Sequence, residues 1–401
     1  MNILFLSLTF PDRLSPERGT YNLGLCAALA RQHRVHVIAP RSWYEWLSTI
    51  RAGGAYRPSP DTEASGVTVD FPAYWYLPKV MPEARGYALW RSTRGAANRC
   101  ARRVRPDVVV SYWAFPDADA GLRLARQFNI PSIVIVGGSD VRLLPKDQAH
   151  SRAVRQVLNQ SSIVATVSDG LRRESIALGV APERARTIRQ GVDPAVFSVG
   201  DRQAARRAIG LGSDEEMLLW VGRMVPVKNL DLLISAVASL RTDRPRLRLH
   251  LIGDGDNRGP LQSRVDAEGL ADAIRFEGPI AHDGLAQWYR AADMTVLSSN
   301  SEGLPNVLRE SLACGTPFVA TDVGDISEIA TPELAKLVPA ANTAAFARAI
   351  VDVLDQSYKR GAEAYVARTW SDAAADFVSL IEELRADRRG SALDPSRRIS
   401  A

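Results

Sequence analysis

Short apolar runs of strand length alternate with helix-like stretches along the whole chain, and this alternation begins a second time near its middle. Several of the runs are unbroken series of Val and Ile, as expected for strands that are covered on both faces. Strands that alternate with helices predict a parallel, doubly wound sheet. Two such series in 401 residues predict two α/β domains, each long enough to bury its own core.

The expected strands can be placed individually. In the first half they are Asn2–Leu8, Val35–Ala39, Val67–Phe71, Asp107–Tyr112, Ser132–Val136, Ile163–Val167 and Arg186–Arg189. In the second half they are Met217–Val221, Leu247–Ile252, Ile274–Glu277, Met294–Leu297, Phe318–Thr321 and Lys336–Val338. We therefore expect a Rossmann-like domain over residues 1–195 and a second over residues 196–368, facing a common cleft. Residues 386–401 are arginine-rich without an apolar run and predict a disordered tail.

Cysteine usage and hydropathy indicate a cytoplasmic protein. The three cysteines, Cys26, Cys100 and Cys314, are far apart in the sequence, which favours neither a disulfide framework nor a zinc site. No apolar run approaches the roughly 18 residues of a membrane-spanning helix. The apolar start of the chain lacks the basic lead of a signal peptide.

The charge is distributed unequally between the two halves. Residues 1–195 contain 26 Lys and Arg against 16 Asp and Glu, whereas residues 196–401 contain 24 against 29. The segment Arg85–Arg105 holds seven arginines and no acid, and it follows the aromatic stretch Phe71–Met81. A helix of this kind is typical of a contact with an anionic membrane, although a solvated basic helix explains it as well.

Two cations follow the first strand of the second half. Gly222 ends this strand, and Arg223 and Lys228 come next, five residues apart, where a loop leads into a helix. Arginine offers a planar fork to phosphate oxygens, and lysine offers a mobile point charge. The pair therefore predicts a diphosphate site, with a solvated surface pair as the alternative.

Two acids surround an expected helix start after the strand Met294–Leu297. Glu302 lies in the loop, Pro305 and Asn306 suit the first position and the cap of the helix, and Glu310 lies about one turn inside it. Carboxylates accept hydrogen bonds from sugar hydroxyls, and the helix N-terminus offers free N–H groups to an anion. Phosphate-binding cations and hydroxyl-binding acids at one sheet edge predict a nucleotide-sugar site.

The two motifs together resemble the donor site of glycosyltransferase family 4, retaining enzymes of the GT-B fold, and the resemblance extends from residue 1 to about residue 385. It implies that Arg223 and Lys228 bind the diphosphate, Glu310 the ribose and Glu302 the transferred sugar, with Arg223, Lys228 and Glu302 as the catalytic residues. It also implies further donor contacts from Gly19, Gly222, Gly253, Gly255, Ile280, Gly303, Leu304, Asn306 and Val307.

The first half resembles the acceptor-binding domain of bacterial polysaccharide-forming members. Gly19 matches the glycine of a loop under the donor phosphates, and Tyr112 and Asp140 lie in acceptor-side loops. Many members carry histidines near positions 112 and 137, where this chain has Tyr112 and Gly137. Residues 369–385 resemble the closing helix that packs back on the first domain.

By this resemblance the chain transfers a hexose or related sugar from a UDP or GDP donor, without metal or cofactor, to a glycan or lipid-linked acceptor. It implies a role in cell-surface polysaccharide synthesis. The pattern Asp117-Ala118-Asp119 matches a metal motif but lies at an expected helix start in the wrong half, where Asp is common. Three alternatives stay open: a non-catalytic nucleotide-sugar-binding protein, a nucleotide-sugar epimerase, and a dinucleotide-dependent oxidoreductase. The last lacks the G-x-G-x-x-G spacing after Gly253.

Overall fold

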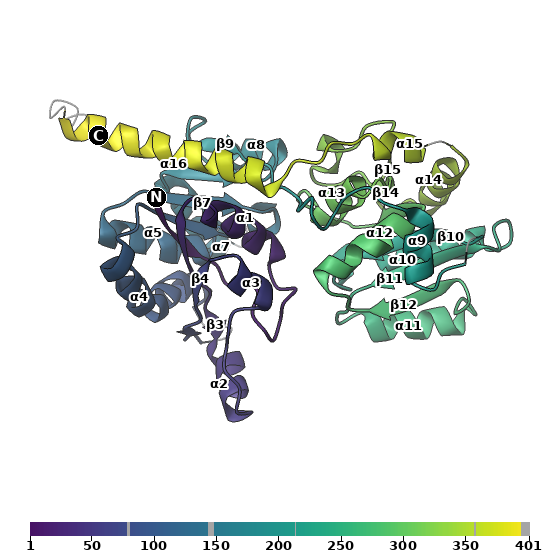
Figure 1. Cartoon of the computed structure of the whole chain (residues 1–401), viewed down its shortest axis with the longest axis horizontal. Helices are drawn as coiled ribbons and strands as arrows, with labels where there is room; N and C mark the ends of the chain where they lie inside the picture. Colours follow the sequence, from purple (N-terminus) through teal and green to yellow (C-terminus); the bar gives the residue numbers. More distant parts are fainter. Residues whose placement is uncertain (78–80, 143–147, 213, 357, 394–401) are drawn as a thin grey trace. The chain divides into compact units, whose positions relative to one another are not determined.

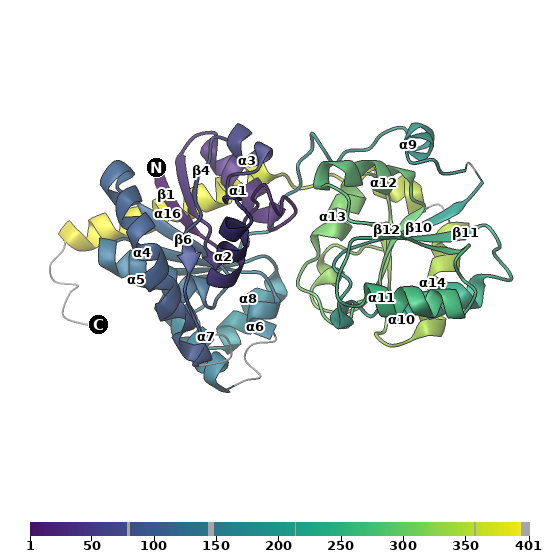
Figure 2. The same cartoon turned by 90° about the horizontal axis from the view of Figure 1, so that it is seen from below.

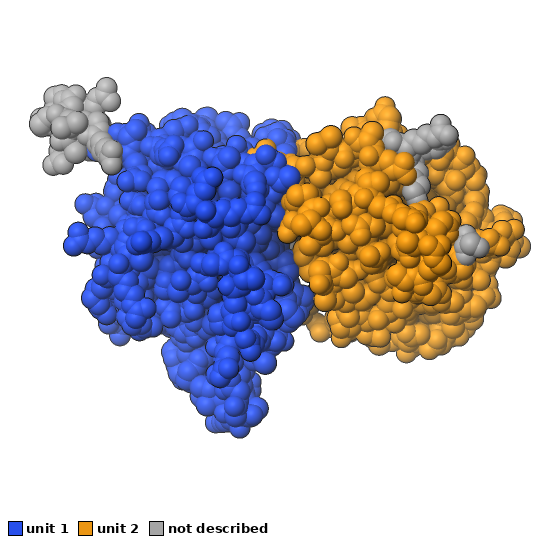
Figure 3. All heavy atoms as spheres, in the orientation of Figure 1, with its two compact units in different colours: residues 1–191, 369–401 blue, residues 192–368 orange. Residues whose placement is uncertain are grey.

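The computed structural model describes residues 1–77, 81–142, 148–212, 214–356 and 358–393. The chain divides into two compact units, drawn in blue and orange in Figure 3. Unit 1 contains Met1–Gly191 and the chain from Thr369 onward, and unit 2 contains Val192–Arg368. The first border lies at Gly191, four residues before the position expected from the sequence.

Unit 1 is built on a parallel sheet with the strand order β4-β2-β1-β6-β7-β8-β9. Its strands are β1 (Asn2–Leu6), β2 (Arg34–Ile38), β4 (Thr68–Asp70), β6 (Val108–Tyr112), β7 (Ser132–Val136), β8 (Ile163–Thr166) and β9 (Ala185–Thr187). Ile3 to Leu6 and Val108 to Tyr112 are buried throughout, since helices cover both faces of the sheet.

The helices of unit 1 are α1 (Thr20–Ala30), α2 (Trp43–Arg51), α3 (Pro60–Ala64), α4 (Arg85–Val104), α5 (Asp117–Phe128), α6 (Ser139–Arg142), α7 (Gln148–Gln160), α8 (Asp169–Ala177) and α16 (Trp370–Leu393). Helices α4 and α5 share one apolar core with β1 and β6. Helix α16 packs on α1, where a side chain at Gly24 would lie 2.5 Å from the ring of Trp370. The C-terminal helix therefore belongs to unit 1.

Helix α16 is longer than the sequence indicates. A disordered tail was expected from residue 386, but the helix continues to Leu393, so this expectation is wrong for residues 386–393. Residues 394–401 of the expected tail lie outside the described residues.

A short two-stranded sheet in unit 1 was not expected from the sequence. Strands β3 (Arg41–Ser42) and β5 (Ala73–Tyr74) pair in parallel, and β3 leads directly into α2. Helix α2 projects from the body of unit 1, as Figure 1 shows. Strands of two residues carry too little alternation to be recognised in a sequence.

Unit 2 repeats the doubly wound design with the strand order β12-β11-β10-β13-β14-β15. Its strands are β10 (Glu216–Val221), β11 (Leu247–Ile252), β12 (Ile274–Gly278), β13 (Met294–Leu297), β14 (Phe318–Thr321) and β15 (Ala335–Val338). All neighbouring strands are parallel, which confirms the α/β fold class for this half as for the first. Parallel strands place their carboxyl ends at one edge, where ligands of such sheets bind.

Helices cover both faces of the unit 2 sheet (Figure 2). They are α9 (Arg202–Ala208), α10 (Leu230–Leu240), α11 (Arg258–Ala267), α12 (Leu285–Ala291), α13 (Asn306–Ala313), α14 (Thr343–Asp355) and α15 (Tyr358–Glu363). Successive residues of β10 point to opposite faces: Leu218 and Trp220 pack with α10, α11 and α14, whereas Met217 and Leu219 pack with α9 and α12. This alternation assigns each of these helices to one face of the sheet.

Candidate active site

The loops that follow β10 and β13 are joined at the carboxyl edge of the unit 2 sheet. These two strands are neighbours, and β10 continues into a 3₁₀ turn, η3 (Pro226–Lys228). The backbone N–H of Asn300 donates to the carbonyl of Val227 over 2.8 Å, and the Ser298 hydroxyl donates to the carbonyl of Lys228 over 3.0 Å. The two sequence motifs, some 70 residues apart, therefore form one surface.

Lys228 and Glu302 meet directly within this surface. The Lys228 Nζ lies 2.5 Å from Oε1 of Glu302, and the Ser299 hydroxyl donates to the same oxygen over 2.6 Å. The lysine side chain is 22% exposed and the glutamate 10%, so both are partly removed from water but still reachable. A lysine held in this way presents its remaining N–H donors to a ligand at the sheet edge.

Arg223 lies on the same edge and is exposed. Among the described residues no ion-pair partner is found for its guanidinium, which leaves it available to an anionic ligand. Its loop approaches the next one very closely, because a Cβ at Gly253 would lie 1.9 Å from the carbonyl oxygen of Gly222. Gly253 also has φ +123°, so only glycine fits at this position.

The other residues that were expected to bind the sugar donor differ in how closely they pack against their neighbours. Gly255 would collide with the carbonyl of Met224 if it carried a side chain, at 2.4 Å. Ile280 packs against the apolar core of unit 2, and Leu304 is buried. Gly303 accepts a hydrogen bond at its carbonyl from Asp325 over 3.1 Å. These residues shape the edge chiefly through backbone and packing.

The start of α13 differs by one position from the expectation. Pro305 is the N-cap and Asn306 the first helical residue, the reverse of the order expected from the sequence. Proline has no side-chain oxygen to bond the first turn, and α13 has no side-chain cap. The Asn306 side chain instead accepts from the guanidinium of Arg309. The N–H groups of the first turn, including that of Val307, are therefore left for a ligand.

Glu310 is held by two side chains that the sequence analysis did not identify. Its Oε1 lies 2.9 Å from Nε2 of His282, in the 3₁₀ turn η4 (His282–Gly284), and its Oε2 accepts from the hydroxyl of Tyr289 over 3.1 Å. Tyr289 is fully buried and Glu310 is 7% exposed. The edge of the His282 ring also contacts Phe197, with centroids 5.0 Å apart. The carboxylate is thus fixed before any ligand arrives.

No role in the site was expected for His282 from the sequence. A usable signal exists in the sequence: His282 and Tyr289 are seven residues apart, two helical turns, and they follow the Gly278–Ile280 loop. Their partner Glu310 is 28 residues from His282, and single-sequence reasoning does not establish such a pairing.

Replacing His282 with Gln should make unfolding less dependent on pH. Burial acts to lower the pKa of His282, but the hydrogen bond and charge of Glu310 outweigh it, aided by Asp283 and Asp193, and raise that pKa above its ordinary value of 6.5. The folded chain then binds the proton more tightly than the unfolded chain. This stabilisation is complete below pH 6.5 and is lost as the pH rises through the folded pKa.

Urea unfolding of the wild type and of His282→Gln across this window measures the effect. Glutamine keeps an N–H donor but does not titrate. The stability advantage of the wild type should shrink towards alkaline pH. An advantage that stays constant or grows would contradict the assignment of the His282–Glu310 pair.

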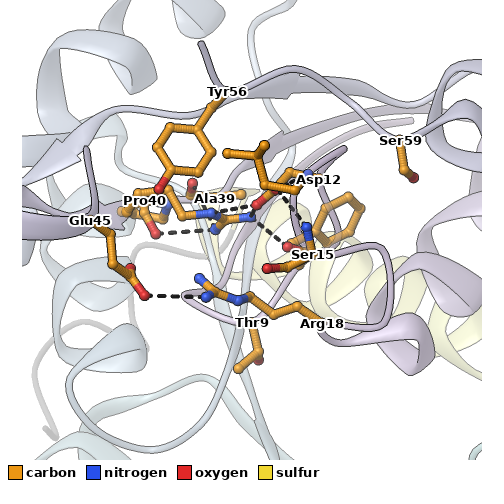
Figure 4. A network of polar contacts seen from close by, with 12 residues as sticks. Thr9, Asp12, Ser15, Arg18, Ala39, Pro40, Glu45, Tyr56 and Ser59 are labelled. Atoms are coloured by element: carbon orange, nitrogen blue, oxygen red, sulfur yellow. Dashed lines mark hydrogen bonds and ion pairs between the residues drawn. The ribbon is translucent and has the colours of Figure 1, made fainter. Parts of the chain in front are cut away.

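In unit 1, the loop before α1 is shaped around Gly19. This residue has φ +69°, and a Cβ there would lie 2.4 Å from the carbonyl oxygen of Thr9. The Asn22 side chain donates to the same carbonyl over 2.6 Å. Asp12 and Arg41 form a buried ion pair that holds the start of the loop, and Figure 4 shows the polar contacts around Asp12. Gly19 is therefore closely packed against the Thr9 backbone.

Gly19→Ala is expected to lower the thermal unfolding temperature by several degrees. The added methyl must move the Thr9 backbone, and alanine adopts positive φ only with strain, together costing roughly 1–3 kcal/mol. Calorimetry measures the change. Gly66→Ala is a matched control, since Gly66 has φ +74° but open space around its Cβ position. Equal losses in both variants would show that contact with Thr9 is unimportant.

Tyr112 and Asp140, which were expected on the acceptor side, lie at the end of β6 and after β7. The Tyr112 ring packs on Tyr21 with centroids 4.9 Å apart, and a Cβ at Gly137 would lie 2.6 Å from the Tyr112 hydroxyl. Asp140 is buried and accepts from the N–H groups of Ala114 and Gly138. Burial raises the pKa of Asp140 to about 6 in spite of these donors. Asp140 therefore holds the loops that follow β6 and β7 through hydrogen bonds to their backbone.

The two acids of the pattern Asp117-Ala118-Asp119 contact different residues of unit 1. Asp117 is buried and accepts from the N–H of Leu8 over 2.6 Å, and burial raises its pKa to about 8. Asp119 pairs with Arg123 one turn along α5 over 3.0 Å. The two acids thus serve different neighbours.

Family models match both halves of the chain. Residues 19–191 match a "Glycosyl transferase 4-like domain", and residues 215–356 match "Glycosyl transferases group 1". The D-inositol 3-phosphate glycosyltransferase of Jonesia denitrificans is 32% identical over 307 residues, which cover 70% of this chain and 72% of that protein. The enzyme of the same name from Thermobispora bispora is 35% identical over 61% of this chain and 59% of its own length.

Solved structures show the same fold at low identity. Sucrose-phosphate synthase from Thermosynechococcus elongatus superposes with a TM-score of 0.78 and 20% identity, covering 96% of this chain and all of that one. HepE from Anabaena, in complex with UDP, gives a TM-score of 0.69 at 18% identity, over 98% of this chain and all of that one.

The two doubly wound units and these neighbours define the GT-B fold. Within that fold class, the chain belongs to glycosyltransferase family 4. Among the described helices, none combines the length and the hydrophobicity needed to cross a bilayer.

Proposed function

We propose that this glycosyltransferase moves a sugar from a UDP or GDP donor with retention of the anomeric configuration. The observation that carries the proposal is the meeting of Lys228 and Glu302 at the carboxyl edge of unit 2, beside exposed Arg223. Cations that bind phosphate and an acid that binds hydroxyls then face one ligand. The UDP complex of HepE, a protein of the same fold, supports a nucleotide donor.

The chemistry of the step requires positive charge near the leaving diphosphate. As the glycosidic bond breaks, negative charge grows on the β-phosphate, and Arg223, Lys228 and the uncapped start of α13 would stabilise it there. Two side-chain cations and a helix N-terminus can replace a divalent cation in this role, so we propose transfer without metal or cofactor. Full activity in the presence of a chelator is the expected result.

The acids of the site receive separate roles in this proposal. Glu310, fixed by His282 and Tyr289, accepts hydrogen bonds from the ribose. Glu302, which shares its Oε1 with Lys228 and Ser299, faces the transferred sugar. Gly222, Gly253, Gly255 and Ile280 form the wall beside the base. We assign no general base.

The acceptor is proposed to be a glycan or a lipid-linked saccharide of the cell surface, contacted through Tyr112 and Asp140 of unit 1. The names of the curated relatives support a second acceptor class, an inositol phosphate. The excess of basic residues in the first half suits either acceptor, because both lipid-linked phosphates and inositol phosphates are anionic.

Incubation with a panel of UDP- and GDP-sugars tests the proposal. We expect slow hydrolysis of one donor and faster transfer when the acceptor is added, and NMR of the product gives its anomeric configuration. Parallel reactions with inositol phosphate and with lipid-linked saccharide separate the acceptor classes. Inversion of configuration, or turnover of no donor, would refute the proposal.

A membrane contact at helix α4 is part of the proposal. Leu89, Ala96 and Cys100 on its inner face are buried in unit 1, so the helix cannot insert into a bilayer. Six of the seven arginines of residues 85–105 are exposed: Arg91, Arg94, Arg99, Arg102, Arg103 and Arg105. Contact with an anionic membrane would therefore be electrostatic at this helix.

Arg91→Gln with Arg102→Gln should weaken binding to phosphatidylglycerol vesicles roughly thirtyfold at low salt. Each arginine near an anionic surface contributes about 1 kcal/mol, so two contribute about 2 kcal/mol. Co-sedimentation at low and high salt measures the loss. Arg207→Gln with Arg246→Gln in unit 2, also exposed, is the matched control. Equal binding by both double variants would remove α4 from the proposal.

A further inference from the structure

Large apolar side chains are exposed in one part of unit 1. Tyr44 and Ile50 of α2 are 50% and 44% exposed, and Trp75 and Leu77, which follow β5, are 54% and 69% exposed. We call residues 43–51 and 73–77 the aromatic protrusion. Single exposed apolar residues are common on protein surfaces, but several together mark an interaction site.

The apolar side chains of helix α2 are only partly covered by the rest of unit 1. Its sequence contains Trp43, Tyr44, Trp46, Leu47 and Ile50, yet none of its nine residues, all described, is buried. A surface helix of a globular protein normally buries such a face against the core. Figure 3 shows the corresponding projection at the base of the blue unit.

Ring stacking and a hydrogen bond nevertheless hold the two segments of the aromatic protrusion together. The rings of Trp43 and Trp75 stack with an interplanar angle of 7° and centroids 6.2 Å apart. The indole N–H of Trp43 donates to the carbonyl of Tyr76 over 2.9 Å. Its apolar side chains are thus presented at low entropic cost, as in a surface prepared for binding.

The aromatic protrusion adjoins the basic helix α4. The backbone N–H of Trp75 donates to the hydroxyl of Ser92 over 3.0 Å, next to exposed Arg91. The Tyr74 hydroxyl donates to the carbonyl of Arg85 over 3.1 Å, and the Arg85 guanidinium lies over the Tyr76 ring. The aromatic side chains of the protrusion therefore lie beside α4. This helix is rich in arginine and contains no acidic residue.

We propose that the aromatic protrusion inserts into the headgroup region of an anionic lipid bilayer, while the α4 arginines bind its surface. Tryptophan and tyrosine favour this region because their rings are apolar and their N–H or O–H groups remain hydrated. The inference rests on the membrane contact proposed for α4 and adds an apolar, salt-resistant component to it. Insertion would place unit 1 at the surface that carries a lipid-linked acceptor.

Charge favours lipid over a second copy of this chain as the occupant. A symmetric dimer through the aromatic protrusion would bring the same patch of both copies together, including the neighbouring arginines of both α4 helices. Like charges at such an interface repel each other, whereas anionic headgroups neutralise them.

Co-sedimentation of the full chain with phosphatidylglycerol–phosphatidylcholine vesicles tests the inference. Tyr44→Ser with Leu77→Ser removes exposed apolar area without opening the core, and should weaken binding about tenfold or more at high salt. Val199→Ser with Val366→Ser, exposed apolar residues of unit 2, is the matched control and should bind as the wild type does. Brominated lipids should quench tryptophan fluorescence in the wild type and less in Trp75→Phe.

Three outcomes would overturn the inference. In the first, the Tyr44→Ser, Leu77→Ser variant binds as tightly as the wild type at high salt. In the second, only the arginine variants lose binding, so that α4 electrostatics alone explain the membrane contact. In the third, the wild type is a dimer and this variant is a monomer. Donor hydrolysis measured without vesicles reports on sugar transfer separately, so a loss there indicates failure of the catalytic proposal instead.

Discussion

Lys228→Ala is expected to reduce the rate of sugar transfer by roughly 10²–10³. The variant removes a cation that would stabilise the leaving diphosphate, and it leaves Glu302 without the ammonium group 2.5 Å from its Oε1. The negative charge of Glu302, no longer opposed by Lys228, would then repel the phosphates in addition to the lost attraction. Arg223→Ala should have an effect of similar size, since its guanidinium lies on the same edge. Initial rates at saturating donor measure both variants.

A control variant separates this effect from a general loss of charge. Arg246 is also exposed, but it precedes β11 and so lies at the opposite, amino edge of the sheet. Arg246→Ala should therefore keep the full rate. A second comparison uses Lys228→Ala with Glu302→Gln: if the repulsion matters, the double variant should lose less than the product of the single losses. Full activity of Lys228→Ala would remove Lys228 from the mechanism.

The second large effect is expected for stability. Asp12→Ala should lower the free energy of unfolding of unit 1 by about 3–5 kcal/mol, because it leaves a buried guanidinium without its partner. Arg41 has no exposed side-chain area, and its Nε and Nη2 lie 2.8 and 2.6 Å from Oδ2 of Asp12. Nη2 also donates to the carbonyl of Phe10 over 2.6 Å (Figure 4).

The exposed pair Arg13–Glu63 provides the matched control in the same region. Its side chains are 46% and 49% exposed, so Glu63→Ala should cost less than about 1 kcal/mol. Urea unfolding monitored by circular dichroism compares the two variants. Similar small losses in both would mean that the Asp12–Arg41 pair is accessible to water. Reduced activity of Asp12→Ala at temperatures where it stays folded would further connect this pair to the glycine loop.

The strand series of both units could be predicted because each strand has its own local pattern. Leu247–Ile252, Met294–Leu297 and Phe318–Thr321 have the bounds expected from the sequence, since each is a short apolar or alternating run between polar segments. The meeting of Lys228 and Glu302 also follows from the sequence, because parallel neighbouring strands end at one edge. The family models and relatives confirm the family that these motifs indicated.

What could not be predicted depends on contacts between distant residues. The spacing of His282 and Tyr289 does not identify Glu310 as their partner, because that pairing and the pairing of Asp12 with Arg41 are set by packing. At α13, Pro305 rather than Asn306 is the cap, because proline fixes φ without an amide hydrogen and tolerates either position. The exposed face of α2 cannot be read from its sequence, whose apolar residues would suit a core helix equally.

Calorimetric titration with nucleoside diphosphates and their sugars tests the central claim most directly, that Arg223, Lys228, Glu302 and Glu310 form one donor site at the carboxyl edge of unit 2. We predict that the wild type binds one UDP or GDP species. Lys228→Ala, Arg223→Ala and Glu310→Gln should each weaken this binding about tenfold or more, and Arg246→Ala should not. Unchanged binding by all three of the variants at Lys228, Arg223 and Glu310 would contradict the site.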